Sequence, residues 1–393
     1  MSGQIDFRSQ ATSLREQLVA WRRDFHAHPE IGFQEHRSAN AIAARLRELG
    51  YQVQTGIAKT GVVGLLEGER PGPVVMLRFD MDALPIFEEN DTDYVSQNPG
   101  VMHGCGHDGH MAIGLGVATL MAQLGDEMAG TLKLVFQPGE EGMNGAEVMV
   151  KEGVLENPRP DVVLATHVWN DSPIGTLDVT PGAVMAAAER WDCTIRGRGG
   201  HGAQPQRTVD PIVVAAQIVV ALQTIVSRNV GPLETAVVTV GSIQGGDTFN
   251  VIPSKVVMEG TIRTYDPQVR ETVLRRVREV IEGVAAACGA EAELEITPLT
   301  PAVINDAEVV EVVRAAARAV VSPENVYSGK RTMGSEDAAY FLRQVPGCYF
   351  FLGSANAERG LDAPHHSPRF DFDEDALPLG VAVMMHALAH YLL

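Results

Sequence analysis

The stretch Val101-Met-His-Gly-Cys-Gly-His107, followed by Asp108, Gly109 and His110, brings a thiol and several imidazoles within a few residues of one another. The glycines between them allow the backbone to turn tightly enough for several of these side chains to converge. Cys105 and His107 are alternate residues, and alternate side chains of an extended segment point to the same side. We therefore predict a metal site here, around which the fold is organised.

Length and composition indicate a globular protein with more than one domain. The chain has 393 residues, of which 45% are hydrophobic and 21% charged, so two domains with sizeable cores are expected. Its formal charge of -19 argues against nucleic acid or an anionic membrane as a partner, because binding to phosphates needs clustered Lys and Arg. An enzyme that acts on a small molecule fits this composition.

The cysteines and the N-terminus indicate the compartment. Four cysteines are scattered along the chain, which is not the pattern of a disulfide framework. The N-terminal Met1-Ser-Gly-Gln-Ile-Asp6 has no basic start followed by an apolar run, and we find no later apolar stretch of about 18 residues. We expect a cytoplasmic protein with thiols available to metal.

Helical and strand patterns alternate on both sides of the opening stretch. Short apolar runs predict buried strands at 62–66, 74–79, 131–136 and 162–166, and helical periodicity predicts helices at 14–26, 38–49 and 112–124. Polar residues follow three of the strands directly: Asp80 and Asp82, Glu140 and Glu141, and His167. In open α/β sheets, sites are built at this edge. We therefore expect these side chains to meet near Cys105.

The pattern changes from about residue 183. Strands at 189–197, 236–243, 256–264 and 291–296 and helices at 211–227 and 268–288 follow in βαββαβ order, which predicts a ferredoxin-like domain. We predict an inserted domain at 183–297 and a metal-binding domain formed by 1–182 and 298–393. In the last part we expect a helix after Asn305, one opened by Ser335, a strand at 348–352 and a helix from Glu374.

The donor types suit a pair of metal ions. Zinc and related ions bind thiolate, imidazole and carboxylate, and these are offered by Cys105, His107, Glu141, His167 and one histidine of Pro364-His-His-Ser-Pro368. Five donors suggest two ions, and ions about 3.5 to 4 Å apart need a bridging ligand. Cys105 is the nearest candidate for the bridging ligand. Asp82 is the candidate for a group that orients His107.

Five ordered motifs resemble one family: Asp80-Met-Asp-Ala-Leu-Pro85, Met102-His-Gly-Cys-Gly-His-Asp108, Gln137-Pro-Gly-Glu-Glu-Gly142, Gly200-His-Gly-Ala203 and His366-Ser-Pro368. They are similar to the co-catalytic metallopeptidases that include hippurate hydrolase, bacterial aminoacylases and plant auxin-conjugate hydrolases. The resemblance implies a mixed-sheet α/β domain with an inserted α+β ferredoxin-like satellite domain, which forms a lid and joins two subunits in a homodimer or a dimer-based oligomer. It also implies hydrolysis of the amide of N-acyl amino acids, with a dipeptidase or carboxypeptidase of the same family as the alternative. A rival hypothesis of another class is a metal-holding protein that binds acyl amino acids without turnover, and Glu140 beside Glu141 weighs against it, because a binding protein needs no base.

Residue roles follow from this resemblance. It implies two divalent ions per subunit, held by Cys105, His107, Glu141, His167 and His366. It makes Glu140 the general base and His201 a group that stabilises the oxyanion, and it places Asn250 and Arg263 in contact with substrate. Arg suits a carboxylate because its planar fork donates two parallel hydrogen bonds.

The chain departs from the wider family in two places. Asp80 stands where many relatives have a histidine, and Cys105 stands where they have a bridging aspartate; the amidohydrolase branch shares both changes. Thiolate favours zinc, the branch implies manganese, and nickel or cobalt are further alternatives.

The other histidines are given different roles. His110 is expected to be structural, and His366 is favoured over His365 as the ligand. His386 and His390 are expected to be a packed or solvent-facing pair.

Overall fold

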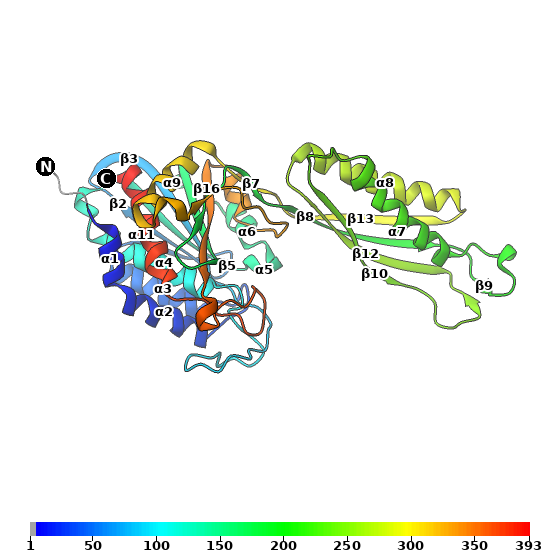
Figure 1. Cartoon of the computed structure of the whole chain (residues 1–393), viewed down its shortest axis with the longest axis horizontal. Helices are drawn as coiled ribbons and strands as arrows, with labels where there is room; N and C mark the ends of the chain where they lie inside the picture. The colour runs from blue at the N-terminus through cyan, green and yellow to red at the C-terminus, as the bar shows by residue number, and fades with distance from the viewer. Residues whose placement is uncertain (1–4) are drawn as a thin grey trace. The chain divides into compact units, whose positions relative to one another are not determined.

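The structure is a computed structural model that describes residues 5–393, and it divides into two compact units (Figure 1). The first unit contains the chain up to Val184, Val303–Lys330 and Asp337–Leu393, and the second contains Met185–Ala302 with Arg331–Glu336. The predicted boundary at residue 297 falls inside a strand, β13 (Glu291–Thr300), and the return of Arg331–Glu336 to the second unit was not predicted. Residues 1–4 belong to the N-terminal stretch for which no targeting signal was predicted, and they lie outside the described part of the chain.

An eight-stranded mixed sheet forms the first unit. Its order is β1-β2-β4-β3-β5-β16-β6-β15, and the four strands β4, β3, β5 and β16 run parallel to one another, whereas β2 and β6 are antiparallel to the strands that they flank. Apart from the first five residues of β3 and the last three of β5, these four strands are almost fully buried, as expected for parallel strands covered on both faces. The strands are β1 (Gln52–Ile57), β2 (Gly61–Glu67), β3 (Arg70–Asp80), β4 (Ala129–Gln137), β5 (Val162–Pro173), β6 (Leu177–Asp178), β15 (Val326–Tyr327) and β16 (Gly347–Ala355).

Helices of the first unit pack on this sheet and on one another. The longer ones are α1 (Phe7–Ser13), α2 (Arg15–Ala27), α3 (His36–Glu48), α4 (His107–Ala122), α9 (Ala307–Val320) and α11 (Ala376–Leu392), and the short ones are α5 (Glu140–Met143), α6 (Gly145–Lys151) and α10 (Ala339–Leu342). Two further short strands, β7 (Gly182–Met185) and β14 (Val303–Asn305), pair with each other.

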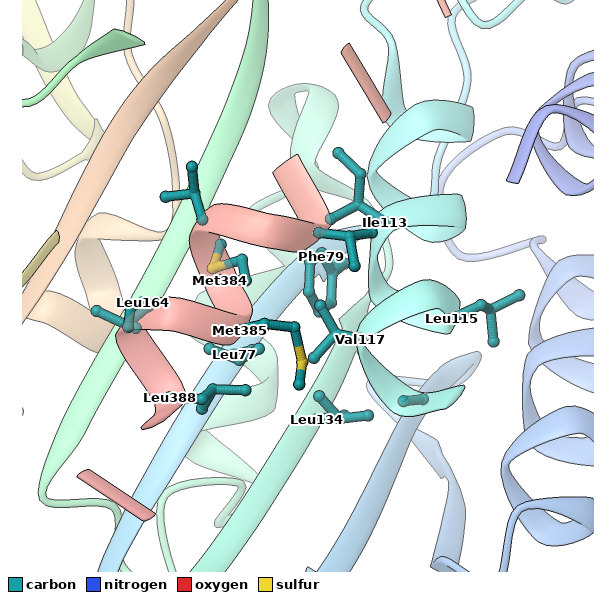
Figure 2. Close-up of a cluster of buried hydrophobic side chains, with 14 of the residues drawn as sticks. Leu77, Phe79, Ile113, Leu115, Val117, Leu134, Leu164, Met384, Met385 and Leu388 are labelled. Carbon is teal, nitrogen blue, oxygen red and sulfur yellow. The ribbon is translucent and has the colours of Figure 1, made fainter. Parts of the chain in front are cut away.

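The main core lies between the central strands and helices α4 and α11. Figure 2 shows Leu77 and Phe79 of β3 facing Ile113 of α4 and Met385 of α11, all of them buried. Gly114 lets α4 approach the sheet closely, because a Cβ there would lie 2.7 Å from a ring atom of Phe79. This packing fixes the N-terminus of α4, where His107 stands, beside the carboxyl end of β3.

Three predicted elements differ from the observed ones. Helix α4 begins at His107, earlier than predicted, and β5 continues to Pro173, because it stays paired with β16 after its pairing with β3 has ended. His167 therefore lies within β5 and not at its end. The helix predicted from Ser335 is a single turn that begins at Ala339.

The second unit has the predicted βαββαβ order. Its antiparallel sheet has the strand order β10-β12-β8-β13, in which the first and third strands in sequence are central. Trp191, Ile218 and Val273 are buried where α7 and α8 cover one face. The elements are β8 (Ala187–Arg196), α7 (Pro211–Arg228), β10 (Ala236–Gln244), β12 (Lys255–Thr264), α8 (Pro267–Ala287) and β13, with a separate pair formed by β9 (Gly200–His201) and β11 (Val251–Ile252).

Helix α7 corrects one expectation from the sequence. Among residues 5–393 it is the one helix that is long and apolar enough to cross a membrane by length and composition. Helices in the cores of water-soluble proteins also meet that criterion, and Val214, Ile218 and Leu222 of α7 are buried in the core of the second unit.

Candidate metal centre

A tight turn at Gly106 brings Cys105 and His107 together. Gly106 has a φ of 92°, in the left-handed region that favours glycine, and a Cβ there would lie 2.3 Å from a methyl carbon of Val168. His107 is already the first residue of α4. The expectation of an extended segment with two side chains on one side is therefore wrong, and the turn performs that task instead.

Three overlapping groups of candidate ligand atoms surround this turn. Cys105, His107 and His167 form one, Cys105, Glu141 and His366 another, and His107, Glu140 and Glu141 a third. Within each group the candidate atoms lie within 4.8 Å of one another. The structure thus gathers the five predicted ligands and the predicted base from four separate segments of the first unit.

Main-chain hydrogen bonds leave one nitrogen of each inner imidazole available to a metal. His107 Nδ1 lies 2.8 Å from the main-chain oxygen of Asp82, and His167 Nδ1 lies 2.5 Å from that of Val168. Both rings therefore carry their hydrogen on Nδ1, the usual support of a metal-binding histidine. His107 Nε2 and Glu141 Oε1 are buried without a hydrogen bond, and their ion-pair partners, Asp80 Oδ2 and His366 Nε2, lie 3.7 Å and 3.3 Å away, so a cation would satisfy them better. This donor set fits divalent metal ions.

The charges of the cluster also favour a cation. Burial, together with the Glu141 and Glu140 carboxylates, raises the pKa of the Cys105 thiol well above its usual value. Burial opposes protonation of His107, yet Asp80 and Asp82 raise its pKa to about 10. Without a metal, therefore, a proton on these groups balances the carboxylates, and a divalent ion could replace it.

Asp82 lies against His107, as its predicted role requires, and also holds the two glutamates. His107 Nδ1 lies 2.8 Å from the main-chain oxygen of Asp82 and 3.4 Å from its Oδ1. The carboxylate also accepts the N–H groups of Glu140 at 3.0 Å and Glu141 at 2.9 Å. The carboxylate of Asp82 thus holds the backbone of the two glutamates, at the first turn of α5. Asp82 is buried, so these hydrogen bonds are protected from water.

The adjacent histidines of the late loop have different surroundings. His366 Nε2 lies 3.3 Å from Glu141 Oε1, and His366 belongs to a candidate ligand group. His365 Nε2 accepts the N–H of Asn170 at 3.1 Å, and its ring packs against Trp169 and Phe370. His365 Nδ1 also lies 3.8 Å from Cys105 Sγ, so both rings are near the cluster and the preference for His366 stays a prediction.

His110 is engaged on both ring nitrogens. Its Nδ1 lies 2.5 Å from Asp80 Oδ1, and its Nε2 accepts the N–H of Val168 at 2.9 Å. His110 also forms a candidate ligand group with Asp80 and His107, so its structural role stays a prediction that these contacts support. Asp80 in turn pairs with the buried Arg78 at 2.7 Å.

Sequence reasoning missed a second buried charge cluster next to the centre. The Arg22 guanidinium, fully buried, pairs with Asp108 at 2.8 Å, with Asp371 at 2.6 Å and with Glu374 at 3.3 Å. Asp108 directly follows His107, so this cluster fixes the first turn of α4. No local pattern in the sequence points to it, because the partners of Arg22 lie 86, 349 and 352 residues away.

The remaining predicted residues belong to the second unit. His201 on β9 pairs across the strands with Val251, the neighbour of Asn250, and its Nδ1 accepts the N–H of Ala203 at 3.0 Å. His201 and Asn250 are exposed. Arg263 on β12 is half-buried and donates to the Thr261 hydroxyl and to the main-chain oxygen of Ile262.

Characterised proteins resemble this chain over most of its length. The N-acetyl-L-cysteine deacetylase of Bacillus subtilis is 40% identical over 370 residues, covering 93% of this chain and 86% of that protein. The N-acyl-L-amino acid amidohydrolase of Geobacillus stearothermophilus is 44% identical over 281 residues, with coverages of 71% and 75%. Thermostable carboxypeptidase 2 of Saccharolobus solfataricus is 36% identical, with coverages of 97% and 95%.

A solved structure agrees with these relatives. The YXEP protein of Bacillus subtilis, described as a dinuclear metal binding peptidase from the M20 family, is 33% identical. It superposes with a TM-score of 0.84, covering 96% of this chain and 98% of that one. Residues 76–390 match the family described as peptidase family M20/M25/M40. With the sheet, the donor cluster and these relatives in agreement, the chain belongs to peptidase family M20/M25/M40.

Proposed function

We propose that this protein is a metal-dependent amidohydrolase that cleaves N-acyl amino acids to a carboxylate and a free amino acid. The observation that carries the proposal is the position of Glu140, which lies with His107 and Glu141 in one group of candidate ligand atoms. Glu141 serves as a ligand and the adjacent Glu140 as a base. A protein that only binds acyl amino acids would need no base. Relatives named as an N-acyl-L-amino acid amidohydrolase and an N-acetyl-L-cysteine deacetylase support the acyl substrate.

The metal ligands, the base and the residues of the second unit have different roles in the proposed hydrolysis. Divalent ions held by Cys105, His107, Glu141, His167 and His366 would polarise the amide carbonyl and lower the pKa of water from about 15.7 towards 7. Glu140 accepts a proton from the attacking water and returns it to the nitrogen of the leaving amine. In the second unit, His201 stabilises the oxyanion, and Asn250 and Arg263 contact the substrate, with Arg263 directed to its carboxylate.

The donor types support two ions and favour zinc. The candidate groups overlap through Cys105, His107 and Glu141, as expected if neighbouring ions are held by one cluster, and a thiolate is a soft donor. The relative described as dinuclear supports the number of ions. Manganese, nickel and cobalt remain to be compared by measuring which ion restores the highest activity.

A peptidase is the second candidate. It is favoured by the relative named as a carboxypeptidase, which the chain matches over 97% of its own length. A substrate with a peptide in place of an acyl group would undergo the same proton transfers at Glu140. The two candidates therefore differ in the preferred group on the amide carbonyl and not in the chemistry.

We also propose a homodimer formed through the second unit, in the cytoplasm. Val213 and Val220, two turns apart on α7, are exposed by 51% and 70%, and the neighbouring β10 is an edge strand. The four free cysteines agree with a reducing compartment. Light scattering of the wild-type protein and of a Val220→Glu variant tests the dimer, which the charged side chain should disrupt.

A substrate panel tests the activity. The purified protein is treated with chelator, dialysed, and supplied with Zn²⁺, Mn²⁺, Co²⁺ or Ni²⁺ before it is assayed on N-acetyl amino acids, N-benzoylglycine and dipeptides. We expect hydrolysis of the acyl amino acids that is lost with chelator and restored by metal. Preference for dipeptides would favour the peptidase, and metal binding without any product would reject the proposed function.

A further inference from the structure

A chain of hydrogen bonds connects Asp80 to His167 through one peptide group. Asp80 Oδ1 lies 2.5 Å from His110 Nδ1, and His110 Nε2 accepts the N–H of Val168 at 2.9 Å. The carbonyl oxygen of the same residue, Val168, lies 2.5 Å from His167 Nδ1. Asp80 and His110 are fully buried, and His167 is 5% exposed, so water does not compete for these contacts.

The sheet explains why Val168 needs a side chain as its partner. Strand β3 pairs with β5 only as far as Arg78 opposite Ala165. Beyond that point β5 is still paired with β16 on its other side, but β3 no longer supplies hydrogen bonds. His110, from α4, takes the place of the missing strand and accepts the N–H of Val168.

The hydrogen bonds determine the hydrogen positions on both rings. Since His110 Nε2 accepts from a main-chain N–H, that nitrogen carries no hydrogen, and Nδ1 is the donor to Asp80. Since His167 Nδ1 donates to the oxygen of Val168, its Nε2 keeps a free lone pair, 3.4 Å from Cys105 Sγ. The two rings also touch, with their centroids 4.6 Å apart and their planes at 75°.

We propose that Asp80 and His110 are positioning residues that orient His167 for metal through the Val168 peptide group. Asp80 is itself held by Arg78, so the orientation is anchored in a buried ion pair. Asp80 also lies close to a second proposed ligand, since its Oδ2 is 3.7 Å from His107 Nε2. The acid that ends β3 therefore faces His107 directly and reaches His167 through His110 and Val168. The inference rests on the proposed function, because it assumes that His167 binds one of the metal ions.

Titration of the metal-free protein with Co²⁺ tests the proposal. His110→Phe keeps a ring but removes both hydrogen bonds, and His110→Gln restores an amide oxygen that can accept from Val168. Support of this kind for a metal-bound histidine contributes about 10-fold to 100-fold to affinity. We expect His110→Phe to weaken one of two Co²⁺ sites by at least tenfold and to change the visible absorption of bound Co²⁺, with partial recovery in His110→Gln.

Thr119→Val serves as the matched control. Thr119 lies on the same helix, α4, and its hydroxyl donates to the main-chain oxygen of Leu115 at 2.8 Å, away from the ligands. This variant should keep the affinity and absorption of the wild type. Wild-type affinity and absorption in a folded His110→Phe protein would overturn the proposal.

Nitrogen NMR of the wild-type protein gives a test that needs no variant. In metal-free protein labelled with ¹⁵N-histidine, both His110 and His167 should carry their hydrogen on Nδ1. A hydrogen on Nε2 of either ring would overturn the proposal, even where the variants fail to fold. Failure of the wild type to bind Co²⁺ or hydrolyse any amide would reject the proposed function, and the NMR result would still decide the hydrogen-bond chain.

Discussion

The buried carboxylate of Asp82 accepts the main-chain N–H of Glu140 at 3.0 Å, beside the candidate metal ligands. Its second oxygen accepts the N–H of Glu141 at 2.9 Å. One side chain after β3 therefore holds the backbone of both the proposed base and a proposed ligand. The positions of these two glutamates relative to His107 depend on Asp82, because the main-chain oxygen of the same residue orients His107.

Replacing Asp82 should disturb both glutamates together. Hydrogen bonds to a charged group contribute about 1.5 to 3 kcal/mol each, and Asp82→Ala removes two. We expect Asp82→Ala to lose at least tenfold in metal affinity and at least a hundredfold in kcat. Asp82→Asn, which keeps one acceptor oxygen, should lie between this variant and the wild type. Calorimetric metal titration and steady-state kinetics measure both effects, and equal behaviour of Asp82→Ala and wild type would contradict this role.

Glu140→Gln should separate catalysis from metal binding. The amide keeps the size of the side chain but cannot accept a proton, and general acid–base catalysis contributes about 10² to 10⁴ in rate. We expect kcat to fall by that factor while metal content, measured by elemental analysis, stays at the wild-type level. Glu141→Gln is the comparison, since it should lose metal as well. A Glu140→Gln enzyme with a near wild-type rate would reject Glu140 as the base.

The sequence predicted the fold well where periodicity and strand ends carry the signal. The runs at 74–79, 131–136 and 162–166 are central strands, and the residues that follow or end them meet at one place. Buried parallel strands are continuous apolar runs, and their carboxyl ends share one edge of the sheet. Fold and donor residues could therefore be predicted together.

What the sequence could not predict depends on contacts between distant segments. The left-handed turn at Gly106, the choice between the carboxylate and the main-chain oxygen of Asp82, and the use of His110 to replace β3 all depend on tertiary packing. The same holds for Arg22, whose acidic partners come from separate parts of the chain. A residue type and its position restrict the chemistry but leave the contacting atom open.

Arg22 should be essential for stability. It is fully buried against three carboxylates, and removing one partner of a buried ion pair costs about 3 to 5 kcal/mol, because the other charges stay buried without compensation. We expect Arg22→Met to lower the free energy of unfolding by that amount in urea titrations. Arg15→Met is the matched control: Arg15 pairs with Asp375 at 2.6 Å but is 44% exposed, so its loss should cost less than about 1 kcal/mol. Equal losses in the two variants would contradict the importance of burial.

The two late histidines should respond differently to substitution. His366→Gln removes a proposed ligand next to Glu141, so we expect the protein to lose metal. His365→Phe keeps the packing against Trp169 and Phe370 and removes the acceptor for the Asn170 N–H and the Nδ1 contact with Cys105 Sγ at 3.8 Å. This variant should retain both ions and be modestly less stable. Elemental analysis of the two variants after dialysis decides the matter, and the reverse result would make His365 the ligand.

Lys133 should make the stability of the first unit depend on alkaline pH. It is 2% exposed, its Nζ donates to the main-chain oxygens of Glu156 at 2.9 Å and Pro158 at 3.0 Å, and burial lowers its pKa to about 8. Between pH 8 and about 10.4, the usual pKa of lysine, the unfolded chain holds a proton that the folded protein has released. Unfolding then takes up a proton, so the free energy of unfolding should rise with pH in this window.

The size and sign of this effect can be measured against one variant. Lys133→Met lacks the amine, so it should be less stable than the wild type because two hydrogen bonds are lost, and it should lack the increase. Other titratable groups are common to both proteins and cancel in the difference. The wild type should therefore gain about 2 to 3 kcal/mol over Lys133→Met between pH 8 and pH 10 in urea titrations. A difference that stays constant, or that narrows as the pH rises, would mean that Lys133 keeps its proton in the folded protein and that the two carbonyl contacts outweigh its burial.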